Sequence, residues 1–212
     1  MLPASFTRGE TPGFIHLYTG RLLLRDHIPA DIETHHRLLS DRRAMYYLQD
    51  IQTNTLAESQ ANLTFSVKEI DHPDRAHVFL RIEERDTGLH IGEIGYTVSA
   101  FTPAGKLADL GYFTHTHCWN KGYTTEAVKA LLRFAFTKDD VIRMSAGCLT
   151  ENIGSERVMQ KCGFIREAEF KQYTWHDGKL KDRVVYRLLR EEWPAAQHTP
   201  YENSIDRTGR NV

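Results

Sequence analysis

The residues with the clearest chemical potential form a short loop in front of a helix, Trp119-Asn120-Lys121-Gly122-Tyr123-Thr124-Thr125-Glu126-Ala127. A loop at a helix start presents unpaired backbone N–H groups and the positive end of the helix dipole, and Gly122 lets a ligand approach the backbone closely. This combination predicts a site for phosphate or pyrophosphate. The alternative is an ordinary strand-to-helix turn with a solvated lysine. Neither GxxxxGK[ST] nor GxGxxG occurs, so a P-loop nucleotidase or a dinucleotide-binding fold has no support.

A second run of reactive side chains, His115-Thr116-His117-Cys118, lies just before the loop. Histidine and cysteine are zinc ligands. These candidate ligands all lie in one short run, however, and the sequence has no second pair of zinc ligands elsewhere to complete a site. We therefore expect a loop near the ligand site and no bound metal.

Periodic segments on either side show which elements must position the loop. Behind it, Thr125 is a suitable helix N-cap, and apolar residues recur at the spacing of one helix face, namely Ala127, Ala130, Leu131, Phe134 and Ala135. In front of it, residues 108–113 are predicted as a strand, and residues 142–148 form the strand after the helix. Asn152 is predicted to cap a short helix that Gly163 ends.

The remaining segments complete a mixed sheet with helices on both faces. Residues 21–25 predict a first strand, and helices are expected from Pro29 to Leu39 and from Leu56 to Ile70. In the second of these helices, the apolar residues are expected roughly on one side, namely Ala57, Ala61, Phe65 and Ile70. A hairpin over residues 78–98 follows, with a bulge between Ile91 and Ile94, and a last hairpin turns at Asp177-Gly178.

Length and composition place these elements in one domain. The chain has 212 residues, of which 41% are hydrophobic and 26% charged, values near the average of globular proteins. No linker rich in Pro, Gly or Ser interrupts it. We expect an N-terminal tail over residues 1–17, a single domain over residues 18–194, and a polar C-terminal tail over residues 195–212.

Charge and cysteine content exclude several classes of function. The 27 Lys and Arg residues against 28 Asp and Glu give a net charge of −1, which lacks the basic excess of a general nucleic-acid-binding protein. Three cysteines without CxxC spacing argue against a disulfide framework and favour a reducing compartment. The sequence contains neither a signal-peptide pattern nor the roughly 20 consecutive apolar residues that span a bilayer. We expect a cytoplasmic protein with neither nucleic acid nor membrane as partner.

Four segments in register resemble the GNAT acyltransferases. They are Gly111-Tyr112-Phe113, Trp119 to Ala127, Asn152-Ile153-Gly154-Ser155 and Lys161-Cys162-Gly163-Phe164, and the likeness runs from about Arg21 to Trp193. Within this family the chain resembles the branch of ribosomal-protein N-terminal alanine and serine acetyltransferases. The resemblance implies an α/β (α+β) fold, with a mostly antiparallel seven-stranded sheet, a splay between the two central strands, and acetyl-CoA as co-substrate.

The resemblance also implies where acetyl-CoA binds. The pantetheine would lie along residues 112–114 (Tyr112, Phe113 and Thr114) and hydrogen-bond Asn152, and Ser155 would lie near the sulfur. The pyrophosphate would contact the N–H groups of Asn120, Lys121, Gly122, Tyr123, Thr124 and Thr125, which form the loop singled out above. Thr124 departs from the family pattern, which has Gly or Ala at this position of the loop. The larger side chain of Thr124 predicts a weaker cofactor affinity.

In this family a primary amine attacks the thioester directly, so a base must remove a proton from the ammonium and an acid must protonate the thiolate. For the base the resemblance favours Asp109, whose alternative role is a structural ion pair; Glu93 on the neighbouring strand, or a chain of waters, could replace it. The usual acid is a tyrosine, but Met159 stands there and donates no proton. The ribosomal branch suggests Ser155 instead, although Asn152 and Ser155 could serve only as local helix caps.

These features predict an acetyl-CoA-dependent N-acetyltransferase whose acceptor is a primary amine, either a protein N-terminus or a small molecule. A homodimer is expected by analogy with the family. The alternative, motivated by Met159 and Thr124, is a catalytically silent acyl-CoA-binding or regulatory module.

Overall fold

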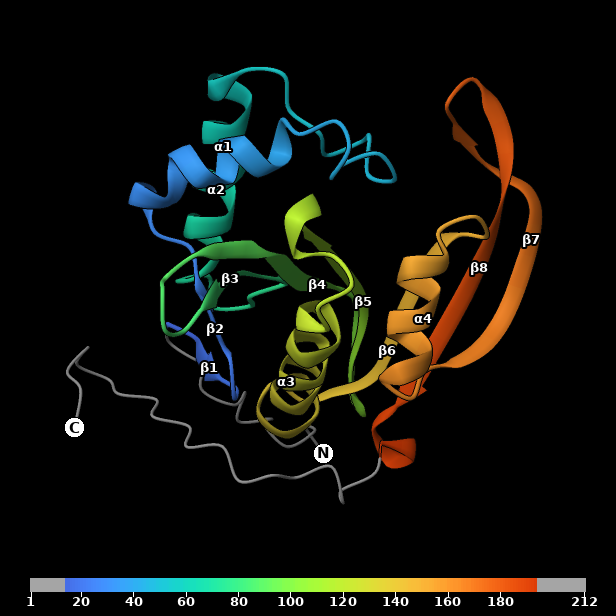
Figure 1. Ribbon diagram of the computed structural model, residues 1–212. Coiled ribbons are helices and arrows are strands. Elements are labelled where there is room, and N and C mark those ends of the chain that lie inside the picture. Colours follow the sequence, from blue (N-terminus) through green and yellow to red (C-terminus); the bar gives the residue numbers. More distant parts are fainter. Residues whose placement is uncertain (1–13, 194–212) are drawn as a thin grey trace, which may run out of the picture.

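The computed structural model describes residues 14–193, which form one eight-stranded sheet with helices on its two faces (Figure 1). The strands lie in the order β1-β2-β3-β4-β5-β6-β8-β7. Their bounds are β1 His16–Tyr18, β2 Leu22–Asp26, β3 His77–Glu84, β4 His90–Thr102, β5 Gly105–Thr114, β6 Val141–Leu149, β7 Ile165–His176 and β8 Lys179–Leu189. In this sheet β5 and β6 run parallel and the other neighbours antiparallel. The predicted mixed, mostly antiparallel sheet is confirmed.

The sheet has one strand more than the seven predicted, and the additional strand is β1. It pairs antiparallel with β2, with His16 opposite Arg25, and it buries Leu17. Three residues are too few to show an alternating pattern, so no strand was predicted there. The first two residues of β1 fall in the segment 1–17 that was predicted as a tail. Residues 1–13 and the predicted tail from residue 195 lie outside the described residues.

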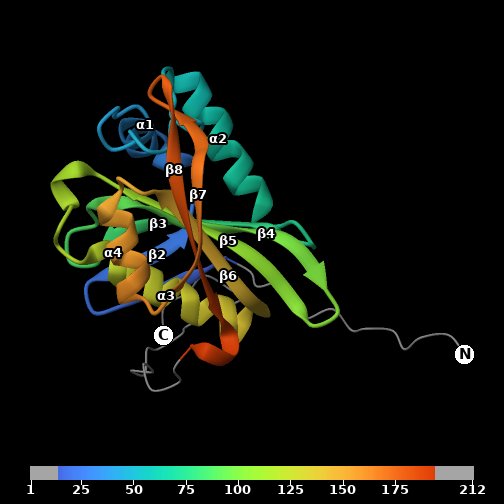
Figure 2. The ribbon, with the colours of Figure 1, turned by 90° about the vertical axis from the view of Figure 1, so that its right-hand side faces the viewer.

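Helices cover both faces of the sheet, as expected (Figure 2). The helices α1 (Ile32–Leu39) and α2 (Leu56–Glu69) lie over one face, and α3 (Tyr123–Lys138) and α4 (Ile153–Lys161) lie over the other. A 3-10 turn at Pro29–Asp31 leads into α1, and two more lie at Thr116–Cys118 and Arg190–Glu192. Among residues 14–193, no helix is both long and apolar enough to cross a membrane.

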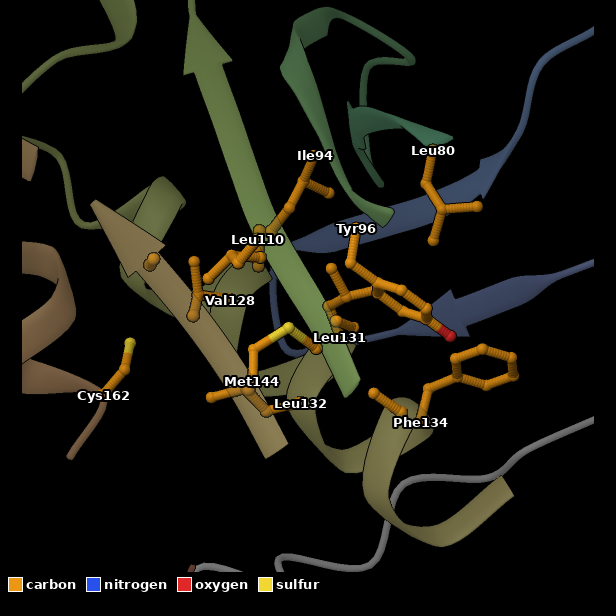
Figure 3. Close-up of a cluster of buried hydrophobic side chains, with 14 of the residues drawn as sticks. Leu80, Ile94, Tyr96, Leu110, Val128, Leu131, Leu132, Phe134, Met144 and Cys162 are labelled. Atoms are coloured by element: carbon orange, nitrogen blue, oxygen red, sulfur yellow. The ribbon is translucent and has the colours of Figure 1, made fainter. Parts of the chain in front are cut away.

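The main core lies between the sheet and α3. Figure 3 shows side chains from β4, β5, β6 and α3 converging there, among them Leu131 and Met144, which are fully buried. Burial of an apolar side chain of this size contributes about 1.5–3 kcal/mol relative to exposure. The hydroxyl of Tyr96 donates to Asp139 Oδ2 at 2.6 Å and so ties β4 to the end of α3. The predicted apolar face of α3 is confirmed and is wider than expected, because Val128 and Leu132 are buried as well.

Local turn and cap signals predicted several element ends correctly. Gly163 has a φ of +87°, and the N–H of Phe164 donates to Met159 O at 3.1 Å, which is the Schellman ending expected for α4. Asp177 and Gly178 both have positive φ, as the tight turn of the last hairpin requires. In β4, Ile82 pairs with Gly92 and Glu83 with His90, so the extra residue of the bulge is Ile91, at the start of the predicted stretch; residues 92–94 pair regularly.

The orientation predicted for α2 is wrong. Of the four apolar residues expected on one side, Ala57, Ala61 and Phe65 are exposed and only Ile70 is buried, whereas Ser59, Leu63 and Ser66 are buried. The buried face is polar because it packs against histidines of α1: Ser59 Oγ lies 2.8 Å from His36 Nδ1. Apolar periodicity selects the wrong face when the partner surface is itself polar.

Candidate active site

The two central strands separate where their pairing ends. β5 and β6 pair in parallel from Lys106 and Val141 to Asp109 and Ser145. Beyond this point residues 110–114 pair only with β4, and residues 146–149 pair only with β8. Each strand then has an inner backbone edge that an extended ligand can bond to, as an added strand does. The predicted splay is confirmed.

The loop after β5 ends in a left-handed residue that starts α3. Gly122 has a φ of +81°, and its carbonyl oxygen accepts the first helical hydrogen bond from Glu126 N–H at 3.1 Å. The N–H groups of residues 123–125 therefore precede the helical ladder and point out of the helix start. The predicted N-cap at Thr125 is wrong, because the left-handed glycine turns the chain into the helix earlier. Thr125 lies in the first turn, where its carbonyl oxygen accepts from Cys162 Sγ at 3.6 Å.

The loop is fixed by a residue that sequence reasoning missed. Arg21 donates to Lys121 O at 3.1 Å and to Glu126 Oε2 at 2.8 Å, and its guanidinium carbon lies 4.6 Å from the centre of the Tyr123 ring. The hydroxyl of Tyr123 donates to Glu84 Oε1 at 2.7 Å. The carboxylate of Glu126 balances the charge of Arg21, so the role of Arg21 is to hold the loop at the helix start. About a hundred residues separate Arg21 from the loop, so no local pattern pointed to it.

The other cofactor-binding candidates near the loop differ in access. Asn120, Lys121 and Gly122 are exposed, and Asn120 has a positive φ of 60° that keeps the loop tightly curved. Thr114 is buried, and its carbonyl oxygen accepts from Trp119 Nε1 at 3.2 Å, so part of its bonding capacity is already used. Phe113 is half-buried against the small cluster of Leu38, Leu39 and Met45. Thr124 is half-buried in the first turn of α3.

Across the splay, the start of α4 brings two hydroxyl groups together. Ser155 Oγ lies 2.9 Å from Tyr112 Oη, and Tyr112 also donates to Ser155 O at 3.1 Å. Asn152 Oδ1 accepts from Ser155 N–H at 3.2 Å, so Asn152 is the cap of α4, as predicted. Burial raises the pKa of Tyr112 far above its ordinary value, so this phenol stays protonated at neutral pH. Ser155 therefore has a proton-bearing neighbour, a pairing that the sequence did not reveal.

Cysteine and methionine complete this side of the splay. Cys148 on β6 is buried, and its thiol donates to Asn152 O at 3.8 Å. Burial raises the pKa of Cys148 to about 11, so the thiol is protonated at neutral pH and is a weak nucleophile. Met159, which stands where the family usually has its acid, is buried in the main core. Cys118, Cys148 and Cys162 are all free thiols, in keeping with the expected absence of a disulfide framework.

The two carboxylates predicted as candidate bases lie in contrasting surroundings. Asp109 is exposed and belongs to the last parallel pair before the splay. Its neighbours Ala108 and Leu110 are buried in the core beside α3. Because successive side chains of a strand point to opposite faces, the side chain of Asp109 lies on the sheet face opposite α3. Glu93 is buried, and its Oε1 lies 2.6 Å from His35 Nδ1. Burial acts to raise the pKa of Glu93, but the neighbouring histidines outweigh it and lower the pKa to about 2. Asp109 therefore has the access that a base requires, whereas Glu93 is a weak base.

Comparison with known proteins identifies the family of this fold and site. The family model of the acetyltransferase (GNAT) domain matches residues 21–165. The chain belongs to the GNAT acetyltransferase family. An uncharacterized N-acetyltransferase of Bacillus subtilis, YnaD, is 30% identical to this GNAT enzyme over 179 residues, which cover 84% of the chain and 99% of the relative.

Two solved structures share the fold of this GNAT enzyme. A ribosomal-protein-S5-alanine acetyltransferase from Vibrio fischeri is 18% identical with a TM-score of 0.72, covering 85% of this chain and 99% of its own. A spermidine N-acetyltransferase from Vibrio cholerae, in complex with CoA and spermine, is 17% identical with a TM-score of 0.72. The match covers 82% of this chain and 99% of the spermidine N-acetyltransferase. The predicted membership of the GNAT family is confirmed, and the protein is an acyltransferase.

Gly122 offers a first test of the cofactor loop of this GNAT enzyme. We expect Gly122→Ala to weaken CoA binding by roughly 5–30-fold, because a side chain at a left-handed position costs about 1–2 kcal/mol and displaces the loop N–H groups. Isothermal titration with CoA measures the change. Gly178→Ala is the matched control, since Gly178 also has a positive φ (+74°) but lies in the distant β7–β8 turn. Equal losses in both variants would contradict a role of the loop in binding.

Proposed function

We propose that this protein transfers an acetyl group from acetyl-CoA to a primary amine, which attacks the thioester directly. The observation that carries the proposal is the splay of β5 and β6 beyond Asp109 and Ser145, which has an anion-binding helix start at one end and a hydroxyl pair beside it. In the proposed complex the pantetheine bonds to the inner edge of β5 near Phe113. The pyrophosphate contacts the N–H groups of residues 120–125, and Asn152 contacts the pantetheine.

The proposed proton transfers use groups on the two sides of the splay. Asp109, exposed where the strands part, accepts the proton that the attacking ammonium must lose. Ser155 donates its hydroxyl proton to the departing thiolate and is reprotonated by Tyr112, whose hydroxyl lies 2.9 Å away. The nitrogen loses two protons on the way from ammonium to amide: Asp109 accepts the first and releases it to solvent, and the second also leaves to solvent, which returns one proton to Tyr112, so the reaction releases one proton overall. Acid–base assistance of this kind typically accelerates a reaction by ~10²–10⁴-fold.

The thiol of Cys148 supports direct attack over a covalent acyl-cysteine. Cys148 lies on the splayed part of β6, close to Asn152, and is therefore the cysteine best placed to take up the acetyl group. Acyl transfer to cysteine requires the thiolate. Because burial raises the pKa of Cys148 to about 11, less than ~0.1% of it is thiolate at pH 7.

For the acceptor, we propose a protein N-terminus, with a small polyamine as the second candidate. The Vibrio fischeri fold relative is named for an alanine of ribosomal protein S5, and the Vibrio cholerae relative was solved with spermine. Both kinds of acceptor are cationic amines before reaction. The exposed carboxylate of Asp109 favours such a cation over a neutral or anionic acceptor.

Thiol release from acetyl-CoA tests this proposal. The full chain is incubated with acetyl-CoA and, in turn, peptides beginning with alanine or serine, spermidine and spermine; the matched controls are the same peptides with blocked N-termini. We expect release that depends on a free amine, and an acceptor that gains one acetyl group by mass spectrometry. CoA binding without release on any acceptor would instead support the catalytically silent module.

We also propose a homodimer formed through the β7–β8 hairpin. Phe170, Tyr173, Trp175 and Leu180 of this hairpin are 42%, 63%, 70% and 50% exposed, which is unusual for large apolar side chains on one hairpin. We expect the double substitution Tyr173→Glu and Trp175→Glu to convert a dimer to a monomer in light scattering. Leu56→Glu, which changes an exposed apolar residue of α2, should leave the dimer intact. A monomeric wild-type chain would contradict the proposal.

A cytoplasmic location is the remaining proposal. The three free thiols suit a reducing compartment, since paired cysteines are typical of oxidising ones. Cell fractionation of the tagged full chain tests it, with recovery in the soluble cytoplasmic fraction expected.

A further inference from the structure

Beneath α1, three side chains from distant parts of the chain meet in the protein interior. His27 follows β2, His35 lies on α1 and Glu93 lies on β4; they are 1%, 0% and 7% exposed. One ligand atom from each lies within 4.8 Å of the other two. His35 Nδ1 is 2.6 Å from Glu93 Oε1, and His27 Nε2 is 3.7 Å from Glu93 Oε2.

His27 is the unusual member of this cluster. Among the described residues, neither of its two buried ring nitrogens has a hydrogen-bond partner. Its nearest polar groups are the carboxylates of Glu93 and Asp31, each 3.7 Å away, which is too long for a hydrogen bond. Buried polar groups nearly always have partners. The imidazole of His27 is therefore aimed into the cluster with its bonding capacity unused.

We propose that His27, His35 and Glu93 bind one divalent transition-metal ion, and that Zn²⁺ fits best. Two histidines and a carboxylate form a known zinc ligand set, with bonds of about 2.0–2.2 Å that place tetrahedral ligand atoms about 3.3 Å apart. The observed separations of 2.6 and 3.7 Å lie on either side of this value, so small side-chain rotations admit the ion. His27 then uses Nε2 and His35 uses Nδ1.

The groups behind the two histidines suit this role. A metal-binding histidine usually donates its other ring N–H to a carboxylate or carbonyl oxygen. Asn62 Oδ1 lies 3.0 Å from His35 Nε2, and Asp31 Oδ2 lies 3.7 Å from His27 Nδ1. Asp31 is itself held by Arg25 at 2.7 Å. His35 thus has an acceptor on its far side, and Asp31 can become one for His27 by a small approach. Without an ion, His35 Nδ1–H donates to Glu93, and metal binding releases this proton.

The charges around the cluster tolerate a dication. The carboxylates of Asp31, Glu83 and Glu93 stand against the guanidinium groups of Arg25 and Arg81, which leaves one negative charge in excess when the histidines are neutral. His90 also approaches Glu93, at 3.9 Å, but its Nε2 already lies 3.1 Å from Gly92 O. The proposed ligand set is therefore the two histidines and Glu93.

This site differs from the metal candidate weighed in the sequence. The run His115 to Cys118 supplies none of the three ligands, and we still expect no metal there. The proposed site does, however, depart from the prediction that the protein binds no metal at all. The ion would join the end of β2, α1 and β4, and so hold the α1 side of the fold on the sheet. The inference does not rest on the proposed acetyl transfer, because none of its ligands is required by that proposal.

Metal titration of the full chain tests the site. After dialysis against EDTA, the wild-type chain is titrated with Zn²⁺ by calorimetry and with Co²⁺ by visible absorption. We expect saturation at one ion per chain, a tetrahedral Co²⁺ spectrum, and a melting temperature that rises with free Zn²⁺. Glu93→Gln and His27→Ala should each weaken binding by at least about 100-fold, since loss of an outer partner alone costs ~10–100-fold.

His117→Ala is the matched control, because His117 is an exposed histidine outside the cluster. It should keep the wild-type affinity. Circular dichroism in EDTA checks that each variant folds; if the ligand variants do not, Asn62→Leu is the second test, with ~10–100-fold weaker binding expected. Absence of saturable binding to folded wild type, unchanged affinity in the folded variants, or a loss confined to His117→Ala would overturn the proposal.

Discussion

Ser155→Ala is expected to lower kcat by ~10²–10⁴-fold while CoA affinity stays close to that of the wild type. The hydroxyl lies at the start of α4 on the splayed side of β6, and its 2.9 Å contact with Tyr112 supplies a route for reprotonation. The helix cap is Asn152, so removing the Ser155 hydroxyl leaves the cap in place. Steady-state kinetics with saturating acetyl-CoA, together with calorimetry for CoA binding, measure the two quantities separately.

Two further variants show whether the effect belongs to the hydroxyl group. Ser155→Thr keeps a hydroxyl and should recover most of the rate. Tyr112→Phe removes the hydrogen-bond partner and should give a smaller loss of kcat than Ser155→Ala. The opposite pattern for Ser155→Ala, with CoA affinity lost and kcat retained, would reduce Ser155 to a structural residue of the helix start.

Asp109→Asn is expected to lower kcat/KM by ~10²–10⁴-fold near neutral pH and to flatten the acidic side of the pH–rate profile. The amide keeps the size of the side chain but cannot accept the proton of the attacking ammonium. Asp109 is exposed at the point where β5 and β6 part, so the substitution should leave the fold unchanged. Initial rates across the pH range, with the same acceptor for both proteins, measure the effect.

Two carboxylate controls accompany this substitution. Asp86→Asn removes an exposed carboxylate in the β3–β4 turn and should leave the profile unchanged. Glu93→Gln tests the second candidate base. If Glu93→Gln flattens the profile and Asp109→Asn does not, the base is Glu93, and its low pKa must then be changed by the bound acceptor.

Sequence patterns predicted those parts of the fold that local chemistry determines. Asn152 and Gly163 bound α4, and Asp177-Gly178 forms the last turn, because caps and tight turns depend on a few adjacent residues. The splay followed from the family resemblance. Of the predicted site residues, Tyr112 of β5 and Ser155 of α4 lie in contact, because both elements border the splay.

Features that depend on contacts between distant segments escaped the sequence patterns. Arg21 fixes the cofactor loop across about a hundred residues, and the His27, His35 and Glu93 cluster joins the end of β2, a helix and another strand. The face of α2 was misassigned because its neighbours are polar: Ser59 is buried against His36, whereas Phe65 is 45% exposed. Periodicity locates a buried face only when burial is apolar.

A crystal structure with bound acetyl-CoA would show directly where the thioester lies. We expect pantetheine between β5 and β6 beyond Asp109, pyrophosphate on the N–H groups of residues 120–125, and the thioester sulfur within hydrogen-bond distance of Ser155 Oγ. A cofactor bound outside the splay, or a sulfur remote from Ser155, would contradict the proposed function.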